Sequence, residues 1–190
     1  KETKNRIKEM RKHFADTGLS SEDISEKEKE MILRSKSVYI KVNEVLESLD
    51  TNELILGICG EEIHIDEFTL IHTFFRHYSE LTKQYDDKKS YFTPEIHYDH
   101  LPIILKEKIL EPIEKSGVFG SSLPQGIFIK YYGRLYKIYF NEKSVNSGHD
   151  TVRRINTFYP VDQKTELQDS KKYNFKKINK NLQVGVIPNA

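Results

Sequence analysis

The spacing of the hydrophobic residues changes at Ile127. Before it, outside the stretch 54–65, apolar residues recur at intervals of three, four and seven, which places side chains on one face of an α-helix. After it, they alternate with polar residues, which predicts β-strands with one buried face. Helices followed by strands are typical of an α+β domain. We therefore expect N-terminal helices followed by a twisted antiparallel β-sheet.

The composition is that of one folded domain without disulfides. Hydrophobic residues make up 37% of the 190 residues, which is enough for a core. Cys59 is the one cysteine, which excludes an intramolecular disulfide framework. No apolar run approaches the ~18 residues that span a bilayer, so we expect no membrane span. Because the chain begins with Lys1, we expect it to be part of a longer protein.

The net charge of +1 conceals two regions of opposite charge. Residues 51–120 carry 7 basic and 13 acidic side chains, a net charge of −6, whereas residues 121–190 carry 12 and 5, a net charge of +7. Such a basic region has the electrostatics of a surface that binds nucleic acid. The alternative is a solvated basic face. We expect the acidic region either to raise the pKa values of its histidines or to bind a basic partner.

We expect residues 1–50 to form a helical segment and residues 51–190 to form the α+β domain. Ser25 and Glu28 have the spacing of a capping box, which predicts the start of a long helix. The apolar residues that follow form one narrow stripe, which needs a partner surface in the domain or in upstream sequence. They are Met31, Val38, Val42, Val45 and Leu49.

A hairpin and two further helices are predicted in the middle of the chain. Two apolar runs in the stretch 54–65 surround Gly60, which predicts paired strands. Asp66 is the expected N-cap of an aromatic helix, and a further helix over 101–115 is expected to end near Pro112. The apolar residues of the aromatic helix are Phe68, Ile71, Phe74, Phe75, Tyr78 and Leu81.

The rest of the chain is predicted to form the sheet. The pair Gly133 and Arg134 lies between two aromatic-rich runs, which is a strong hairpin signal. Residues 152–159 predict a third strand and residues 182–187 a fourth. We expect the Lys- and Asn-rich stretch 164–180 to be a connection between them.

Candidate acid–base residues lie on the aromatic helix. His72 and His77 are five residues apart, so they lie at opposite borders of its apolar stripe and cannot chelate one metal as an i, i+4 pair. Arg76 lies one turn after His72 on the same side, where both side chains could reach one phosphate. The alternative is that one or both histidines are hydrogen-bonded at the edge of the core.

Candidate phosphate ligands lie on the strand over 152–159. Because alternate residues of a strand share a face, we expect Arg153, Thr157 and Tyr159 on one face and Arg154 on the other. A cation, a hydroxyl and a phenol in one line suit a phosphodiester. The alternative is an edge strand in which Thr and Tyr serve β-propensity.

Two other stretches contain candidate histidines. The stretch from Asp99 to Pro102 has the Asp-His-x-Pro core of an HNH metal-nuclease motif. However, a predicted helix follows His100 directly, and the next asparagine is Asn141. His149 lies in a predicted loop and is a candidate mobile acid or base, for which the alternative is an ordinary solvated histidine.

The segment 65–77, with its His, three residues, a basic residue and a His, resembles a helix of the barnase, EndoU, colicin and RelE-like (BECR) group of phage and polymorphic-toxin nucleases. The stretch 101–113 resembles the following helix and proline turn of that group, and residues 127–140 resemble its hairpin. The strand ending at Tyr159 resembles its Thr-x-Tyr strand. The resemblance covers about residues 53–160.

The resemblance implies RNA cleavage without a metal or other cofactor. A base removes the 2′-OH proton, the alkoxide attacks phosphorus, and an acid protonates the leaving 5′-oxygen, which gives a 2′,3′-cyclic phosphate. The catalytic residues are then expected to be His72, Arg76, His77, Thr157 and Tyr159. The residues expected to bind nucleic acid, with exposed tyrosines stacking on bases, are Lys130, Tyr131, Tyr132, Tyr136, Arg153 and Arg154.

The function expected from this resemblance is that of an endoribonuclease toxin. The expected target is transfer RNA in the cytoplasm of a bacterial cell, reached after secretion or delivery as the C-terminal part of a larger protein. The expected protein partner is a cognate immunity protein. The alternative is a noncatalytic module that binds nucleic acid through its basic sheet or a protein through its amphipathic helix. A metal-dependent HNH-like nuclease ranks third.

Overall fold

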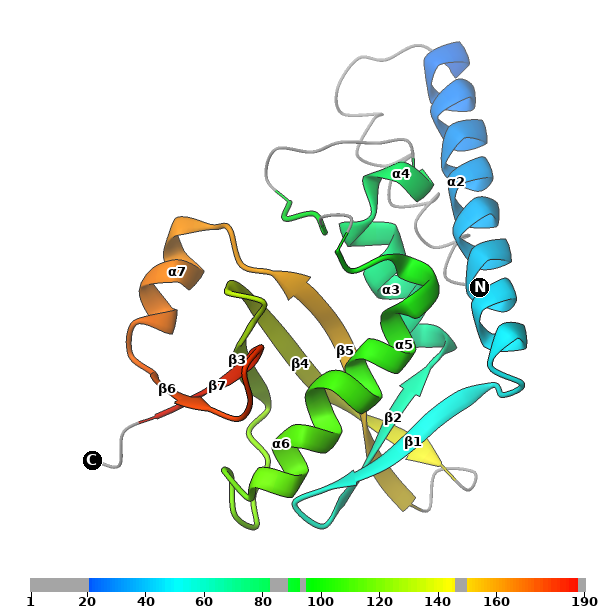
Figure 1. The fold of residues 1–190 in the computed structure, drawn as a ribbon. Helices are drawn as coiled ribbons and strands as arrows, with labels where there is room; N and C mark the ends of the chain where they lie inside the picture. Colours follow the sequence, from blue (N-terminus) through cyan, green and yellow to red (C-terminus); the bar gives the residue numbers. More distant parts are fainter. Residues whose placement is uncertain (1–20, 83–88, 93–94, 146–149, 188–190) are drawn as a thin grey trace.

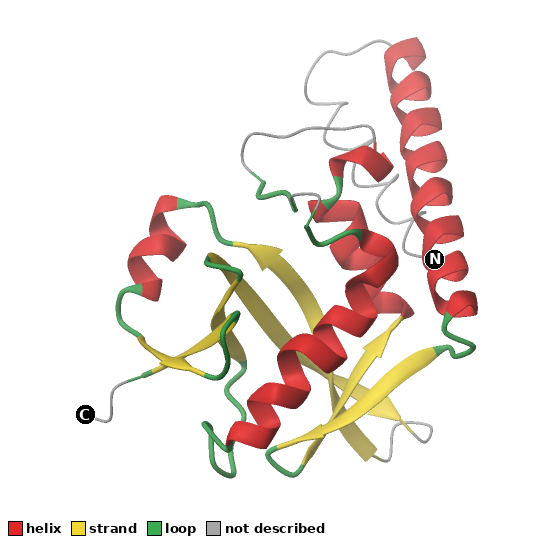
Figure 2. Ribbon diagram, in the orientation of Figure 1, coloured by secondary structure: helices red, strands yellow, loops and turns green. Residues whose placement is uncertain are grey.

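The computed structural model describes residues 21–82, 89–92, 95–145 and 150–187 (Figure 1). Within them the chain is an α+β protein, as predicted, with helices preceding most of a seven-stranded sheet (Figure 2). The strand order is β1-β2-β5-β4-β3-β7-β6, and β2 and β5 are the one parallel pair in the described residues. His149 and the predicted loop residue Pro94 lie outside the described residues. The elements are α2 (Ser21–Ser48), β1 (Glu53–Ile58), β2 (Glu61–Asp66), α3 (Glu67–His77), α4 (Ser79–Thr82), η1 (Tyr98–His100), α5 (Leu101–Ile103), η2 (Ile104–Leu110), α6 (Glu111–Ser116), β3 (Gly126–Tyr131), β4 (Arg134–Val145), β5 (Asp150–Pro160), α7 (Lys164–Ser170), β6 (Asn174–Lys177) and β7 (Leu182–Val186).

Helix α2 packs its predicted apolar stripe against α3 and α4 (Figure 1). Val38, Val42 and Val45 are at most 2% exposed and belong to the same core cluster as the strands. Helix α2 therefore shares the core of the sheet. Burial of each such side chain contributes about 1.5–3 kcal/mol to the free energy of unfolding. The capping-box prediction is wrong, because the helix already begins at Ser21 and Ser25 lies in its second turn.

Segments α5, η2 and α6 form one continuous helical rod across a face of the sheet (Figures 1 and 2). The helix predicted over 101–115 is confirmed, and it continues one residue further, to Ser116. Pro112 lies in the first turn of α6 and does not interrupt the rod. Segment η2 is π-helical, and the Glu111 N–H reaches back to the carbonyl of Lys106. This widened turn precedes the proline, which has no N–H to donate and whose ring needs space in the preceding turn.

The rod ends at Gly117, which has a left-handed backbone with φ of 61°. A residue with a Cβ is strained there, although a Cβ would meet no atom within 4 Å. We expect Gly117→Ala to lower the free energy of unfolding by about 1 kcal/mol. Gly57→Ala is the matched control, because Gly57 is equally open and has no positive φ. Equal effects of the two substitutions in urea denaturation would contradict this account.

Both predicted hairpins are present and have two-residue turns. Cys59 and Gly60 join β1 to β2, with φ of 55° and 78°. Tyr132 and Gly133 join β3 to β4, with φ of 48° and 79°. Two left-handed residues match the right-handed twist of the strands. The second turn lies one residue earlier than predicted, because Arg134 already pairs with Tyr131 as the first residue of β4.

A bulge in β5 changes which side chains share a face. Tyr139 pairs with Thr157 and Phe140 pairs with Ile155, so Asn156 is an extra residue. Consequently Arg154 lies on the same face as Thr157 and Tyr159, and the prediction that Arg153 does so is wrong. We call this face, which lies opposite the helical rod, the outer face. Among its residues on β4 and β5 are Lys137, Tyr139, Asn141, Arg154, Thr157 and Tyr159.

The stretch 164–180 contains more structure than the predicted connection. It forms helix α7 and strand β6, and β6 pairs with β7 at the edge of the sheet. Its six lysines are all exposed, and they are Lys164, Lys171, Lys172, Lys176, Lys177 and Lys180. The basic region predicted from the sequence is therefore a surface at this end of the sheet.

Candidate functional site

Helix α3 is fixed beside β5 by the turn in which it begins. The Asp66 side chain caps the helix, as predicted, by accepting from the N–H of Thr69 at 3.1 Å. The Thr69 hydroxyl donates to the carbonyl of Ile155 on β5 at 2.6 Å. This anchor sets the two ends of α3 against the outer face. Phe68 lies against the Arg154 guanidinium at one end, and His77 lies against Tyr159 at the other.

His77 is a buried histidine in contact with the outer face. It is 9% exposed, and its ring stacks on Tyr159 with 5.2 Å between ring centroids. Its Nδ1 lies 2.7 Å from the carbonyl oxygen of Ser90. A carbonyl only accepts, so Nδ1 carries the hydrogen and Nε2 is the basic nitrogen of the neutral ring. The sequence allowed His77 to be either a catalytic residue or a histidine hydrogen-bonded at the edge of the core. In the structure it is hydrogen-bonded at the edge of the core and also lies near the candidate phosphate ligands.

Burial lowers the pKa of His77 to about 4. The hydrogen bond to Ser90 opposes this shift, and the charges of His72, Arg76 and Lys89 add to it. The expectation that the acidic region raises the histidine pKa values is therefore wrong for His77. At neutral pH the ring is uncharged, so it is able to accept a proton and unsuited to donate one as an acid.

The pH dependence of stability tests this burial. Between pH 6.5 and about 4 the unfolded chain binds a proton at His77 that the folded chain does not. The free energy of unfolding therefore falls as the pH is lowered through this window, by about 3 kcal/mol in total. We expect His77→Asn, which keeps a donor near Nδ1, to remove this part of the pH dependence. The exposed His100→Asn is the control, and an unchanged profile in His77→Asn would refute the burial.

The other two polar residues predicted on α3 lie nearer the solvent. His72 is half-buried, and its ring stacks on Phe68 with 6.0 Å between centroids. Arg76 is exposed one turn later. Since Phe68 also contacts Arg154, the helix brings His72 to the neighbourhood of the outer face. His77 thus contacts β5 directly and His72 reaches it through Phe68, whereas Arg76 is exposed on the helix.

Tyr159 and Lys137 are joined by one acidic side chain. The Tyr159 hydroxyl donates to Glu166 Oε1 at 2.5 Å, and Lys137 Nζ lies 3.2 Å from the same oxygen. Burial and the hydrogen bond to Glu166 raise the pKa of Tyr159, so its phenol stays a donor. The Thr157 hydroxyl is buried and has no hydrogen-bond partner among the described residues.

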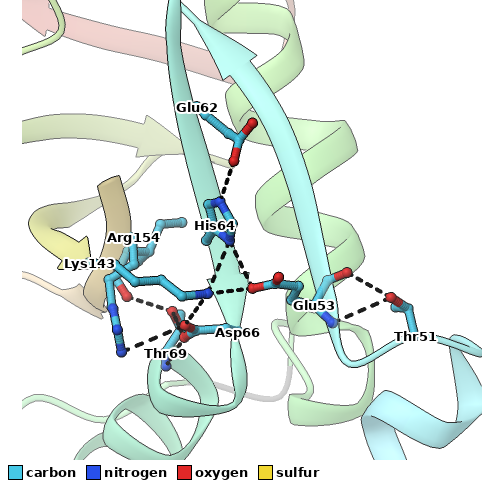
Figure 3. A network of polar contacts seen from close by, with 9 residues as sticks. Thr51, Glu53, Glu62, His64, Asp66, Thr69, Lys143 and Arg154 are labelled. Atoms are coloured by element: carbon cyan, nitrogen blue, oxygen red, sulfur yellow. Dashed lines mark hydrogen bonds and ion pairs between the residues drawn. The ribbon is translucent and has the colours of Figure 1, made fainter. Parts of the chain in front are cut away.

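A network of charged side chains supports the outer face near β2 (Figure 3). His64 is 3% exposed, and its two ring nitrogens lie 2.8 Å from Glu53 and 2.7 Å from Glu62. Lys143 donates to Glu53 at 2.5 Å and lies 3.2 Å from Asp66. Burial opposes the charge on Glu53, but hydrogen bonds from His64 and Lys143 outweigh it and lower its pKa. Sequence reasoning missed His64, although alternation in β2 places it with Glu62 and Asp66.

Several residues predicted to bind nucleic acid are placed elsewhere. Tyr131 and Tyr136 are 9% and 3% exposed, so the prediction that they are exposed is wrong. They face the core because the register of β3 and β4 turns them inward. Arg153 is held by Glu61 at 2.7 Å and by the carbonyl of Leu123 at 2.6 Å. By contrast Tyr132 is 67% exposed at the hairpin tip.

Lys130, the remaining residue of that predicted set, lies on β3, where its ammonium is 4.3 Å from the centre of the Phe175 ring.

The Asp-His-x-Pro stretch lies in η1 and α5, so a helix follows His100 directly, as the sequence predicts. The described residues contain no group of three or more His, Cys, Asp or Glu side chains placed to hold a metal ion. None of the helices in the described ranges is long and apolar enough to cross a membrane.

Comparisons with known proteins identified no relative of the chain. No protein-family model matches the chain, and neither a curated protein nor a solved structure matches it. The BECR resemblance therefore stays a prediction. The fold brings His77 into contact with Tyr159, and it places Arg154 and Thr157 on the outer face with Tyr159.

Proposed function

We propose that the chain is a ribonuclease that binds RNA across the outer face and cleaves it by attack of the 2′-hydroxyl. The observation that carries the proposal is the neutral His77 ring stacked on Tyr159. A neutral imidazole suits the base that takes the 2′-OH proton. It borders a strand that carries the guanidinium of Arg154 and the hydroxyls of Thr157 and Tyr159, which suit a phosphate.

The proposed reaction needs a base, an acid and groups that stabilise charge. His77 takes the 2′-OH proton at Nε2, the alkoxide forms a bond to phosphorus, and the bond to the 5′-oxygen breaks. His72 protonates the leaving oxygen, because the low pKa of His77 makes it a poor acid. Arg76 and Arg154 stabilise the negative charge on the phosphorane. The products are a 2′,3′-cyclic phosphate and a 5′-hydroxyl.

The charge of the sheet supports a polyanionic substrate. Residues 121–190 carry 12 basic and 5 acidic side chains, and the six lysines of the stretch 164–180 are exposed. Lysines on an edge strand also prevent sheet-to-sheet aggregation, which is the structural alternative for β6. Transfer RNA as the target, an immunity protein as the partner and delivery into a bacterial cell are carried by the resemblance alone and stay predictions.

A noncatalytic nucleic-acid-binding protein is the second candidate. The observation that favours it is the engagement of Tyr159 and Lys137 with Glu166, which already satisfies the hydroxyl of Tyr159, one of the proposed phosphate ligands. The deep burial of His77 points the same way. Both candidates bind RNA on the outer face, and they differ in whether a bond is broken.

Cleavage of RNA in EDTA separates the two candidates. We expect wild-type protein to produce 2′,3′-cyclic phosphate ends, and we expect His77→Asn to lower the rate by about 100-fold or more. His100→Asn is the matched control and should cleave as the wild type does. Intact RNA with bound wild-type protein would favour the noncatalytic candidate. Cleavage that requires an added divalent metal would favour the metal-dependent alternative.

Two adjacent arginines test the position of the RNA. Arg154 lies on the outer face, whereas the bulge turns Arg153 toward Glu61. We expect Arg154→Gln to weaken RNA binding and to reduce the slope of log affinity against log salt by roughly one, because one phosphate contact is lost. Arg153→Gln should leave that slope unchanged. Equal slopes for the two variants in filter binding would place the RNA elsewhere.

A further inference from the structure

Two donors of the outer face converge on one oxygen atom. The Tyr159 hydroxyl and Lys137 Nζ approach Glu166 Oε1 at 2.5 Å and 3.2 Å. Tyr159 and Lys137 are directly paired across β5 and β4, so the sheet itself holds the two donors together. Glu166 comes from a different element, the short helix α7. The two donors are thus a fixed pair, and the acceptor is supplied by a separate segment.

We propose that the Glu166 carboxylate occupies an oxyanion site of the outer face, and that a phosphate group of the substrate replaces it there. The inference rests on the proposed function in so far as it takes that substrate to be RNA. A phosphate oxygen accepts from the same donors as a carboxylate oxygen, and it brings further acceptors and charge. Glu166 is then an inhibitory residue that RNA must displace.

The position of this oxyanion site fits the reaction. Tyr159 carries the His77 ring on its face, with 5.2 Å between the centroids and 10° between the planes. A phosphate held by the Tyr159 hydroxyl therefore lies beside the proposed base. Lys137 is also oriented by the Phe128 ring, whose centre lies 5.1 Å from Nζ. Both donors keep these supports when Glu166 leaves.

Helix α7 is built to separate from the sheet at small cost. Five of its seven residues are exposed, and Leu167, the large apolar residue of the helix, is 38% exposed. Segments that bury little apolar surface open locally at low free energy. Glu166, with about one fifth of its side chain exposed, is the inward-facing charged residue of α7. The contact of Glu166 with Lys137 and Tyr159 is therefore a main attachment of α7 to the sheet.

The test compares two neutralising substitutions on α7. Glu166→Gln keeps the shape of the side chain and removes its charge, so we expect inorganic phosphate to bind about tenfold more tightly in calorimetric titration. Asp169→Asn is the matched control, because Asp169 pairs with the exposed Lys172 at 2.7 Å and should leave phosphate affinity unchanged. Adding Lys137→Gln to Glu166→Gln should abolish the gain.

The outcomes separate this inference from the proposed reaction. Equal affinities of Glu166→Gln and the wild type, or equal gains in Glu166→Gln and Asp169→Asn, would overturn it. If Glu166→Gln gains phosphate affinity and neither protein cleaves RNA, the oxyanion site stands and the reaction fails. If Glu166→Gln does not fold by circular dichroism, Glu166→Asp provides the same comparison, because a shorter side chain withdraws the carboxylate from Tyr159.

Discussion

The carboxylate of Asp66 is the contact on which the candidate site depends. One of its oxygens accepts from the N–H of Thr69 and starts α3, and the other lies 3.2 Å from Lys143 and 3.6 Å from Arg154. One side chain, 11% exposed, thereby ties the end of β2 to α3, β4 and β5. Because a buried carboxylate is costly unless it is paired, these contacts fix the direction in which α3 leaves the sheet. The positions of Phe68 and His77 follow from that direction.

The bulge at Asn156 is the second constraint, because it decides which groups meet on the outer face. Without the extra residue, strict alternation would keep Arg153 with Thr157 and Tyr159. With it, Ile155 and Phe158 both enter the core at 0% exposure, and Arg154 replaces Arg153 on the outer face. The burial of the second of these apolar side chains outweighs the loss of regular pairing at one position.

Features that depend on local sequence could be predicted, and features that depend on pairing could not. Asp66 as a helix cap, the hairpins and the stripe of α2 follow from turn chemistry and spacing within one segment. The burial of Tyr131 and Tyr136 follows from the register between strands, which a single strand does not encode. Pro112 is tolerated inside a helix because a π-helical turn precedes it. No residue type in the sequence predicts that turn.

Charge summed over a segment was a poor guide to the electrostatics of the histidines. The segment 51–120 has a net charge of −6, yet the pKa of His77 is lowered, because burial acts on the ring itself and the charges that reach it are those of His72, Arg76 and Lys89. Charges beyond about 8–10 Å are screened by salt. Of the acidic side chains in this segment, Glu53, Glu62 and Asp66 are held by His64, Lys143 and Arg154. These negative charges are thus paired within the sheet, and the His77 ring stays neutral, which is the state that a base requires.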